Sequence, residues 1–390
     1  MAHLRTISSR RLLAAVLAIA ALAIGGGIAQ AALSGSASPP PAKPLDRAVH
    51  DALTAPEPAG VSARIEFTNG LLPGGSLPAG GGSPLAAGAS GRIWLADDGR
   101  ARLELQSAAG DAQIAVDRDG VRVFDAGTRT VYEIAAPERL REPRRTAGAP
   151  GVADVDRALG RLAEAWTLSD AQPGTTGDRP SYTVRIAPKD DGGLLGAAEL
   201  AWDAARGVPL RAAVFAQGET DPVLALEATD VEFGPVADAD LAVQAPAGTR
   251  TVAIDQPVHA GAAGAAPARL RGRAAIAAAL PFRLVAPDRL AGLPRTGIRL
   301  VRSGREAGAL LTYGEGLGAV AVIEHRAGAD GAPLGAIADR LPKVNLDGAT
   351  GTELATALGT VVTFERGGVA YTVAGLVPPV AAENAARGLR

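Results

Sequence analysis

The sequence predicts an α+β protein with two folded parts: a large, strongly curved antiparallel half-barrel covered by helices, then a smaller α/β sandwich-type domain. Most segments between residues 45 and 250 alternate apolar and polar side chains with a period of two, as half-buried strands do. Asp-Gly and similar turn pairs separate these segments, which favours antiparallel neighbours. An Ala/Gly/Pro stretch over residues 251–268 forms a linker before a second, shorter set of alternating segments, over residues 269–390.

Residues 1–33 have the order of an export signal. Arginines precede the apolar run Leu12 to Ile24, and Ala29-Gln30-Ala31 follows it, which matches a signal peptide with an A-x-A cleavage site. Continued to Leu33, the apolar segment is long enough to cross a bilayer. The sequence therefore predicts export, and it leaves open both cleavage after Ala31 and retention as a signal anchor.

A Ser/Pro-rich linker, residues 34–44, precedes the half-barrel domain, residues 45–250. Leu45 to Leu53 has the apolar spacing of a short amphipathic helix, which Pro56 and Pro58 end. The first predicted strand, residues 61–68, alternates strictly, and turn pairs such as Asp98-Gly99 separate the strands that follow. These are residues 91–96, 101–106, 111–117, 121–125 and 128–134.

Two segments interrupt this meander. The glycine-rich stretch Gly70 to Gly88 has no periodicity and is predicted to be a mobile loop. Val152 to Thr167 has the spacing of an amphipathic helix. Strands are predicted again at residues 182–186, 198–202, 210–216 and 223–233, which makes roughly nine or ten strands and two helices in the first domain.

The second domain is predicted to begin with a short helix near Arg271 to Leu280 and to end with a helix over Pro379 to Leu389, which has proline at its start. Between them, strands are predicted around residues 297–302, 307–313, 319–325, 359–366 and 369–374. The three glycines of Tyr313 to Gly318 join two strands with no helix behind them, so this segment is interpreted as a hairpin turn and not as a phosphate loop.

The composition argues against several classes of function. With 39 basic and 41 acidic residues the chain lacks the charge of a nucleic-acid binder. It has no cysteine and four histidines, so thiol catalysis, disulfides and cysteine-ligated metals are excluded. No serine-hydrolase elbow, P-loop, zinc-protease or EF-hand motif is present. The sequence therefore predicts a protein that is not an enzyme and needs no metal or cofactor.

The concave face of the half-barrel is the candidate binding site. Inward-pointing apolar residues of its strands would form either an ordinary packed core or an unfilled cavity for acyl chains, and the sequence leaves both interpretations open. In the second interpretation the helix Val152 to Thr167 or the loop Gly70 to Gly88 would move as a lid. The predicted lining residues are Ile65, Phe67, Leu103, Leu105, Ile114, Val116, Val184, Leu200 and Trp202.

Two C-terminal segments resemble a known family. Residues 312–324, TYGEGLGAVAVIE, are similar to a "Y-S-D-G-L…S-V-F-V-E" hairpin, and residues 368–386 are similar to a "T-V-V-G-E-x-P-P-x-T-A-x-x-I-A" segment. Both patterns belong to periplasmic sigma-E regulatory proteins of the MucB/RseB type, in which a LolA-like half-barrel precedes a small second domain. The chain departs from the pattern at Glu315, which replaces aspartate, and at Ala319 and Ala321.

The resemblance implies a function outside the cytoplasmic membrane. In this family the half-barrel is similar to the lipoprotein carrier LolA and binds acyl chains, and the second domain contacts a membrane-bound anti-sigma factor. It implies an exported, non-enzymatic lipid- or lipoprotein-binding protein in the periplasm or at the outer face of the cytoplasmic membrane, acting as an acyl-chain carrier or an envelope-stress sensor. The partner surface would include Tyr313, Glu315 and Gly316. The alternative is a membrane-tethered interaction module with a filled core and no ligand, which recognises a peptide through an exposed strand edge.

Overall fold

The computed structural model describes residues 38–71, 84, 88–108, 110–135, 151–190, 193–243, 245–254, 272–303, 306–328 and 334–390. The predicted export signal, most of the loop at 70–88 and most of the linker at 251–268 lie outside the described residues. The chain forms two compact units, Met1–Lys189 with Gly196–Asp255 and Asp190–Leu195 with Gln256–Arg390. Within the described ranges, no helix is both long and apolar enough to span a membrane.

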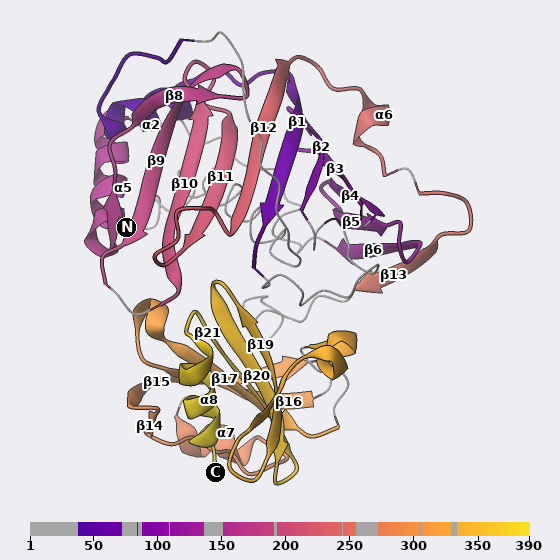
Figure 1. The fold of residues 1–390 in the computed structure, drawn as a ribbon, viewed down its shortest axis with the longest axis vertical. Coiled ribbons are helices and arrows are strands. Elements are labelled where there is room, and N and C mark those ends of the chain that lie inside the picture. The colour runs from indigo at the N-terminus through magenta and orange to yellow at the C-terminus, as the bar shows by residue number, and fades with distance from the viewer. Residues whose placement is uncertain are drawn as a thin grey trace. The chain divides into compact units, whose positions relative to one another are not determined.

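The first unit is built on one curved sheet of 13 strands, which confirms the predicted antiparallel half-barrel (Figure 1). The strands follow the order β13-β6-β5-β4-β3-β2-β1-β12-β11-β10-β9-β7, with β8 paired to β9. Their bounds are β1 Gly60–Asn69, β2 Ala89–Ala96, β3 Ala101–Ser107, β4 Gly110–Val116, β5 Gly120–Asp125, β6 Thr130–Ala135, β7 Trp166–Leu168, β8 Gln172–Thr176, β9 Arg179–Pro188, β10 Leu195–Asp203, β11 Pro209–Ala216, β12 Leu224–Phe233 and β13 Arg250–Ile254.

Three of these strands were not predicted, so roughly nine or ten strands is too few. β7 directly follows a helix, and its Trp166 also fits the apolar spacing of that helix. β8 contains proline and glycine, which are rare inside strands. β13 runs parallel to β6 and extends into the segment that the sequence predicts as a linker. Isolated short strands of this kind depend on a neighbour in the sheet and leave little periodic signal.

Helices cover one end of the sheet. α2 (Leu45–Thr54) packs its apolar side, which includes Ala48, against Tyr182, Val184 and Trp202. α5 (Val152–Ala165) packs against α2. It ends two residues before the predicted Thr167, because the backbone at its C-cap is already extended and leads into β7. A single turn, α6 (Asp238–Leu241), lies against β2 and β3.

The polypeptide just before α2 is anchored to the half-barrel. The Tyr182 hydroxyl donates a hydrogen bond to the Pro41 carbonyl oxygen at 2.6 Å. Lys43 lies over the Tyr182 ring, 5.3 Å from its centroid, and its ammonium group pairs with Asp51 of α2 at 2.7 Å. Residues 41–43, which the sequence places in the Ser/Pro-rich linker, are thus part of the packed unit.

Gly207 sets the distance between the β10–β11 turn and α2. A Cβ atom at this position would lie 2.1 Å from the Ala52 carbonyl oxygen, and the backbone φ is +64°. We expect Gly207→Ala to destabilise the first unit by about 2 kcal/mol more than Gly218→Ala. Gly218 has a similar φ of +80° but no atom within 4 Å, so the control carries only the backbone strain. Urea unfolding followed by tryptophan fluorescence measures the difference, and equal losses would contradict the close contact.

The second unit is an eight-stranded sheet in the order β14-β15-β16-β17-β21-β20-β19-β18. The hairpin between β16 and β17 contains a 3-10 turn, η1 (Gly316–Gly318), which confirms the interpretation of Tyr313 to Gly318 as a turn. The strands are β14 Arg289–Leu290, β15 Leu293–Ser303, β16 Glu306–Tyr313, β17 Val320–Arg326, β18 Lys343–Asn345, β19 Thr350–Thr356, β20 Gly359–Arg366 and β21 Val369–Gly375. β14, β18 and β19 were not predicted.

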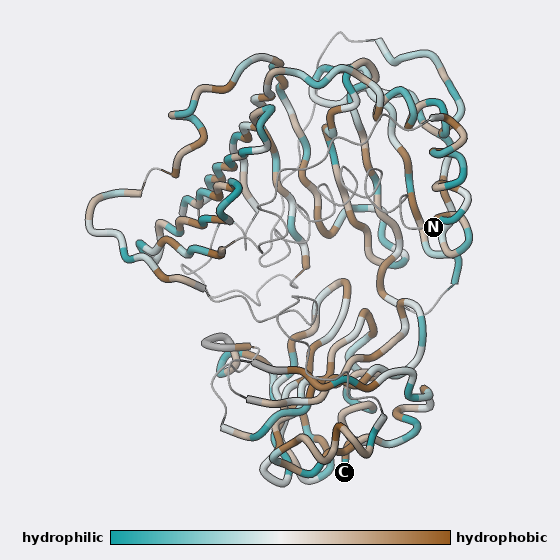
Figure 2. The backbone as a smooth tube through the Cα atoms, turned by 180° about the vertical axis from the view of Figure 1, so that it is seen from behind, coloured by the Kyte–Doolittle hydropathy of each residue, from teal (hydrophilic) through white to brown (hydrophobic). Residues whose placement is uncertain are grey.

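The helices α7 (Arg273–Ala278) and α8 (Pro379–Arg387) share one apolar core with one face of this sheet. A second 3-10 turn, η2 (Gly335–Arg340), precedes β18. Alternation of apolar and polar residues along the strands is visible in Figure 2. The smaller domain is therefore a sheet with helices packed on one side, as predicted.

A carboxyl group lies inside this core. Glu324 of β17 is fully buried, and one of its oxygens accepts a hydrogen bond from the Val285 amide at 2.9 Å. Its other oxygen has no hydrogen-bond partner among the described residues. Burial raises the pKa of Glu324 to about 7, because a charged carboxylate is poorly solvated there, and the Val285 amide opposes the shift.

Candidate functional site

Strand register places a continuous set of apolar residues on one face of the first sheet. Residues directly opposite each other on paired strands point to the same face. One such row crosses the sheet from β1 to β6: Ala63, Ile93, Leu103, Ile114, Val123 and Tyr132. We call this side of the sheet the apolar face.

All nine predicted lining residues lie on the apolar face. Leu103 pairs with Ile114 on β4 and with Ile93 on β2, and Ile93 pairs with Ala63 on β1. The predicted residues of β1, β3 and β4 therefore share this face. On the other side of the sheet, Arg211 of β11 pairs with Glu199 of β10 at 2.7 Å. Leu200 and Trp202 therefore face the opposite way from this ion pair, toward α2, together with Val184 on β9.

The part of the apolar face under α2 is filled. Val184 and Trp202 are buried there, and the Trp202 ring lies 6.2 Å from that of Tyr182. Leu200 packs at the margin of the same cluster. These three residues act as an ordinary core.

The centre of the apolar face is also closed. Ile65, Phe67 and Leu105 are each no more than 2 % exposed, and Leu103 is 8 % exposed. Burial of this kind stabilises the unit by about 2 kcal/mol per large side chain. A polar substitution at these positions would destabilise the fold, so a loss of binding would not report on the site itself.

The apolar face is more accessible on β4, β5, β6 and β13, which we call the open wing. Val116 is 39 % exposed, and Ile114 is half-buried. The register adds five half-buried residues that were not predicted as lining: Val121, Val123, Tyr132, Ile134 and Val252. Their alternation with Arg122 and Glu133 is a usable signal in the sequence, except for Val252, whose strand was not predicted.

The other face of the open wing is partly covered. Phe124, Val131 and Ala115 are buried on that side, whereas Arg122 and Glu133 are exposed. Nearby, buried Arg102 donates to the Asp240 carbonyl of α6 at 3.1 Å. Both faces of the open wing therefore carry accessible side chains, which are apolar on one face and charged on the other.

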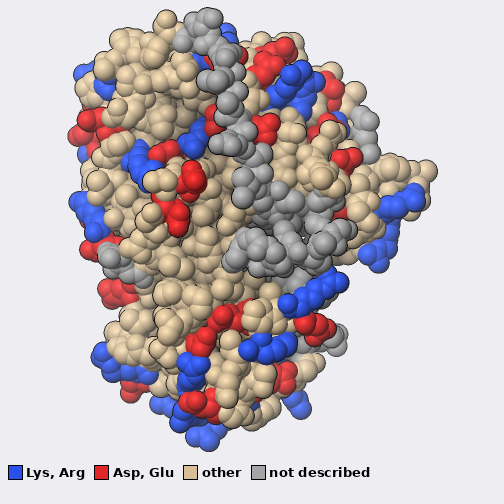
Figure 3. Space-filling model, viewed as in Figure 1, with Lys and Arg blue, Asp and Glu red and all other residues tan. Residues whose placement is uncertain are grey.

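Elsewhere the outer face of the sheet is held by ion pairs. Arg211 bridges Glu199 and Glu227, and Arg185 also pairs with Glu199 at 2.7 Å. Burial alone would raise the pKa of Glu199, but the two arginines outweigh it and lower the pKa. Acidic and basic side chains are interspersed over the surface that Figure 3 shows.

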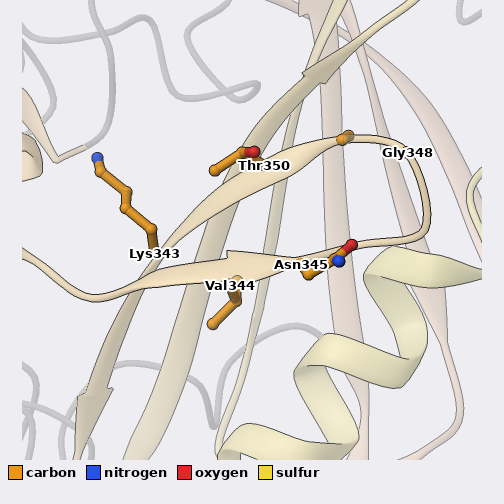
Figure 4. A pocket seen from close by; sticks show the side chains of 6 residues that line it. Lys343, Val344, Asn345, Gly348 and Thr350 are labelled. Carbon is orange, nitrogen blue, oxygen red and sulfur yellow. The ribbon is translucent and has the colours of Figure 1, made fainter.

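Two hollows in the described residues lie away from the apolar face. The larger, about 440 Å³, is lined by six residues of the β18–β19 hairpin (Figure 4). The Lys343 ammonium beside it donates to the Ala338 carbonyl and to the Thr352 hydroxyl. The other, about 270 Å³, is lined mainly by polar residues such as Arg64, Glu66 and Arg92. The part of the chain that the structure describes holds no cluster of three or more metal-binding side chains.

The predicted partner residues of the second unit separate into two kinds. Tyr313 is fully buried in the core, because it lies on the same face of β16 as buried Leu311 and Ala309. Glu315 and Gly316 are exposed at the hairpin tip. Contact of this hairpin with a partner stays a prediction. Glu315 and Gly316 are the two predicted residues that can touch a partner directly.

The architecture defines a class: a two-unit protein in which a curved half-barrel is followed along the chain by a smaller, helix-covered sheet. No protein-family model and no curated protein matches the chain. Among solved structures it is similar to the MucA/MucB complex of Pseudomonas aeruginosa, with 17 % identity over 88 % of this chain and 95 % of that chain and a TM-score of 0.43. MucB in complex with MucA(peri) gives 19 % identity, coverage of 89 % and 97 %, and a TM-score of 0.42.

The chain is also similar to a solved structure that it matches over a smaller share of its length. A LolA superfamily protein from Nitrosomonas europaea is 11 % identical over 52 % of this chain and 99 % of that chain, with a TM-score of 0.21. These likenesses concern the fold.

Proposed function

We propose that this chain is an exported, non-enzymatic protein that binds lipid or lipoprotein acyl chains on the open wing of its half-barrel. The observation that carries the proposal is the accessible apolar side of β4, β5, β6 and β13, which is continuous with the buried centre of the apolar face. Each methylene group that an acyl chain buries there contributes about 0.8 kcal/mol. Helix α5 packs against α2 at the other end of the sheet, so access to the open wing does not require α5 to move.

The proposed setting is the periplasm or the outer face of the cytoplasmic membrane, where the chain acts as an acyl-chain carrier or as an envelope-stress sensor. The export-signal pattern of residues 1–33 supports the location. The proposed partner of a sensor is a membrane-bound anti-sigma factor, supported by the motif resemblance at residues 312–324 and 368–386. N-terminal sequencing of membrane and soluble fractions distinguishes a tethered sensor from a cleaved, shuttling carrier.

Lipid binding is tested with a charge on the open wing. We expect Val123→Asp to weaken uptake of a fluorescent fatty acid by the delipidated full chain at least tenfold, because a carboxylate would have to lose its water against the acyl chain. Val123 is half-buried, so the variant should still fold, with an unchanged tryptophan spectrum.

The matched control is Arg122→Asp, which puts the same side chain one position away, on the other face of β5. It should take up the probe like the unsubstituted chain. Undiminished uptake by a folded Val123→Asp variant would overturn the binding site. Mass spectrometry of organic extracts from protein purified without detergent identifies the bound species.

The second candidate function is a membrane-tethered interaction module with a filled core and no ligand. The packed cluster of Val184, Leu200 and Trp202 under α2 favours it. An extract without any acyl species, together with failure to bind the fatty-acid probe, would select this function over lipid binding.

A further inference from the structure

The four sheet edges of the two units are very unequal in length. The first sheet ends in β13, of 5 residues, and at its other side in β7 and β8, of 3 and 5 residues. The second sheet ends in β18, of 3 residues, and in β15, of 11 residues, to which β14 adds only 2. Proteins usually shorten edges because unpaired N–H and C=O groups recruit further strands. β15 departs from this rule.

The backbone geometry shows which groups β15 offers at this edge. The Arg295 amide points outward and donates to the Asp288 carbonyl at 2.9 Å, while the Gly314 amide donates to the Pro294 carbonyl across the β15–β16 pair at 2.8 Å. A bulge follows between Arg295 and Gly297, and regular pairing then continues to Ser303. By the alternation of an antiparallel ladder, the amides of Ile298 and Leu300 point to the free edge, and the Arg299 amide faces β16.

The free part of β15 is rigidly held. The side chains of Ile298 and Leu300 pack against the core of the second unit, whereas Arg299 is exposed. None of the described strands pairs with β15 beyond the two-residue β14 and its partner β16. An edge that is already extended and anchored loses little conformational freedom when another strand adds to it.

Charge indicates the chemistry of the partner. Residues 293–303 contain three arginines and no acidic residue, although acidic residues slightly outnumber basic ones in the whole chain, 41 to 39. Arg295 already pairs with Asp288 at 2.7 Å, so the positive charge described on the free part of the edge is that of exposed Arg299. We propose that the free edge of β15 binds an extended acidic segment of another protein by strand addition. This interaction surface is separate from the open wing and does not depend on lipid binding.

The test uses the full chain and two short capped peptides, one alternating glutamate with valine and the other lysine with valine. We expect the glutamate peptide to bind at least tenfold more tightly than the lysine peptide. We also expect it to slow amide hydrogen exchange at Ile298 and Leu300 but not at Arg299. Arg299→Glu should weaken the glutamate peptide about tenfold, which corresponds to about 1.4 kcal/mol.

Arg326→Glu is the matched control, since Arg326 is also exposed but lies on β17 in the interior of the same sheet. It should leave binding of the glutamate peptide unchanged. Equal binding of the two peptides, binding of neither, protection at another edge, or an equal effect of the two charge reversals would each overturn the proposal. Val123→Asp should retain peptide binding and Arg299→Glu should retain uptake of the fatty-acid probe, so the two proposals fail independently.

Discussion

Replacing Glu324 with glutamine should stabilise the second unit by about 3 kcal/mol at pH 8 and by no more than about 1 kcal/mol at pH 5. The pKa of this carboxyl is raised from 4.5 to about 7 by burial, so the folded unit holds the proton at pH values where the unfolded chain has released it. Its contribution is therefore fully present below pH 4.5 and is lost as the pH rises to about 7. Glutamine is never charged and can keep the bond from the Val285 amide.

Urea unfolding followed by far-ultraviolet circular dichroism across this pH range measures the effect. The exposed Glu365 on β20 gives the control, Glu365→Gln, which should keep the pH dependence of the unsubstituted chain. A weaker dependence of the same sign should persist in Glu324→Gln, because burial, and then the nearby Glu383, also raise the pKa of Glu353. If Glu324→Gln leaves the pH dependence of the unfolding free energy unchanged, the Glu324 carboxyl is not its source.

Gly91→Ala should destabilise the first unit by about 3 kcal/mol or more. A Cβ atom at Gly91 would lie 1.8 Å from the Glu104 carbonyl oxygen and 3.2 Å from the Leu105 Cα. Both obstacles are backbone of the paired strand β3, so no side-chain rotation relieves them. The ladder between β2 and β3 must open where the sheet carries the buried centre of the apolar face.

Tryptophan fluorescence isolates this effect, because all three tryptophans, Trp94, Trp166 and Trp202, belong to the first unit. Gly174→Ala is the control: this glycine is also in a strand, without a positive φ, and no atom lies within 4 Å of the place that an added methyl group would take. It should change stability by less than about 0.5 kcal/mol. Similar losses in the two variants would show that lost backbone freedom, and not the contact with β3, is responsible.

Local patterns predicted most of the fold because each strand of the meander carries its own alternation. Val61 to Phe67 alternates along β1, and the turns Asp98-Gly99 and Asp119-Gly120 join β2 to β3 and β4 to β5 as antiparallel pairs. The two halves of the sheet are joined by the pairing of β12 with β1, whose residues are far apart in the sequence. No local pattern encodes such a pairing. For the same reason β13, a five-residue strand that depends on β6, escaped prediction.

The candidate site was predicted only in part. A period of two gives the face on which a side chain lies, and it placed Val184 and Val116 correctly on one face. It does not say what covers that face: Val184 lies under α2, whereas Val116 is exposed. Tyr313 lies on the same face of β16 as Leu311, which places it in the core, although its motif suggested a partner surface.

The hydrogen bond between Tyr182 and the Pro41 carbonyl limits how far the half-barrel can lie from the end of the predicted apolar segment at Leu33. The eight residue-to-residue steps from Leu33 to Pro41 can span at most about 28 Å. If the apolar segment before them is kept in the bilayer, the half-barrel stays in a thin layer of solvent beside that membrane, and the proposed lipid exchange takes place at high effective concentration. A tethered carrier of the proposed kind would pass its lipid only to an acceptor that enters the same layer. Cleavage at the predicted site after Ala31 would remove this limit, so one peptide bond would decide whether the proposed carrier serves one surface or the whole compartment.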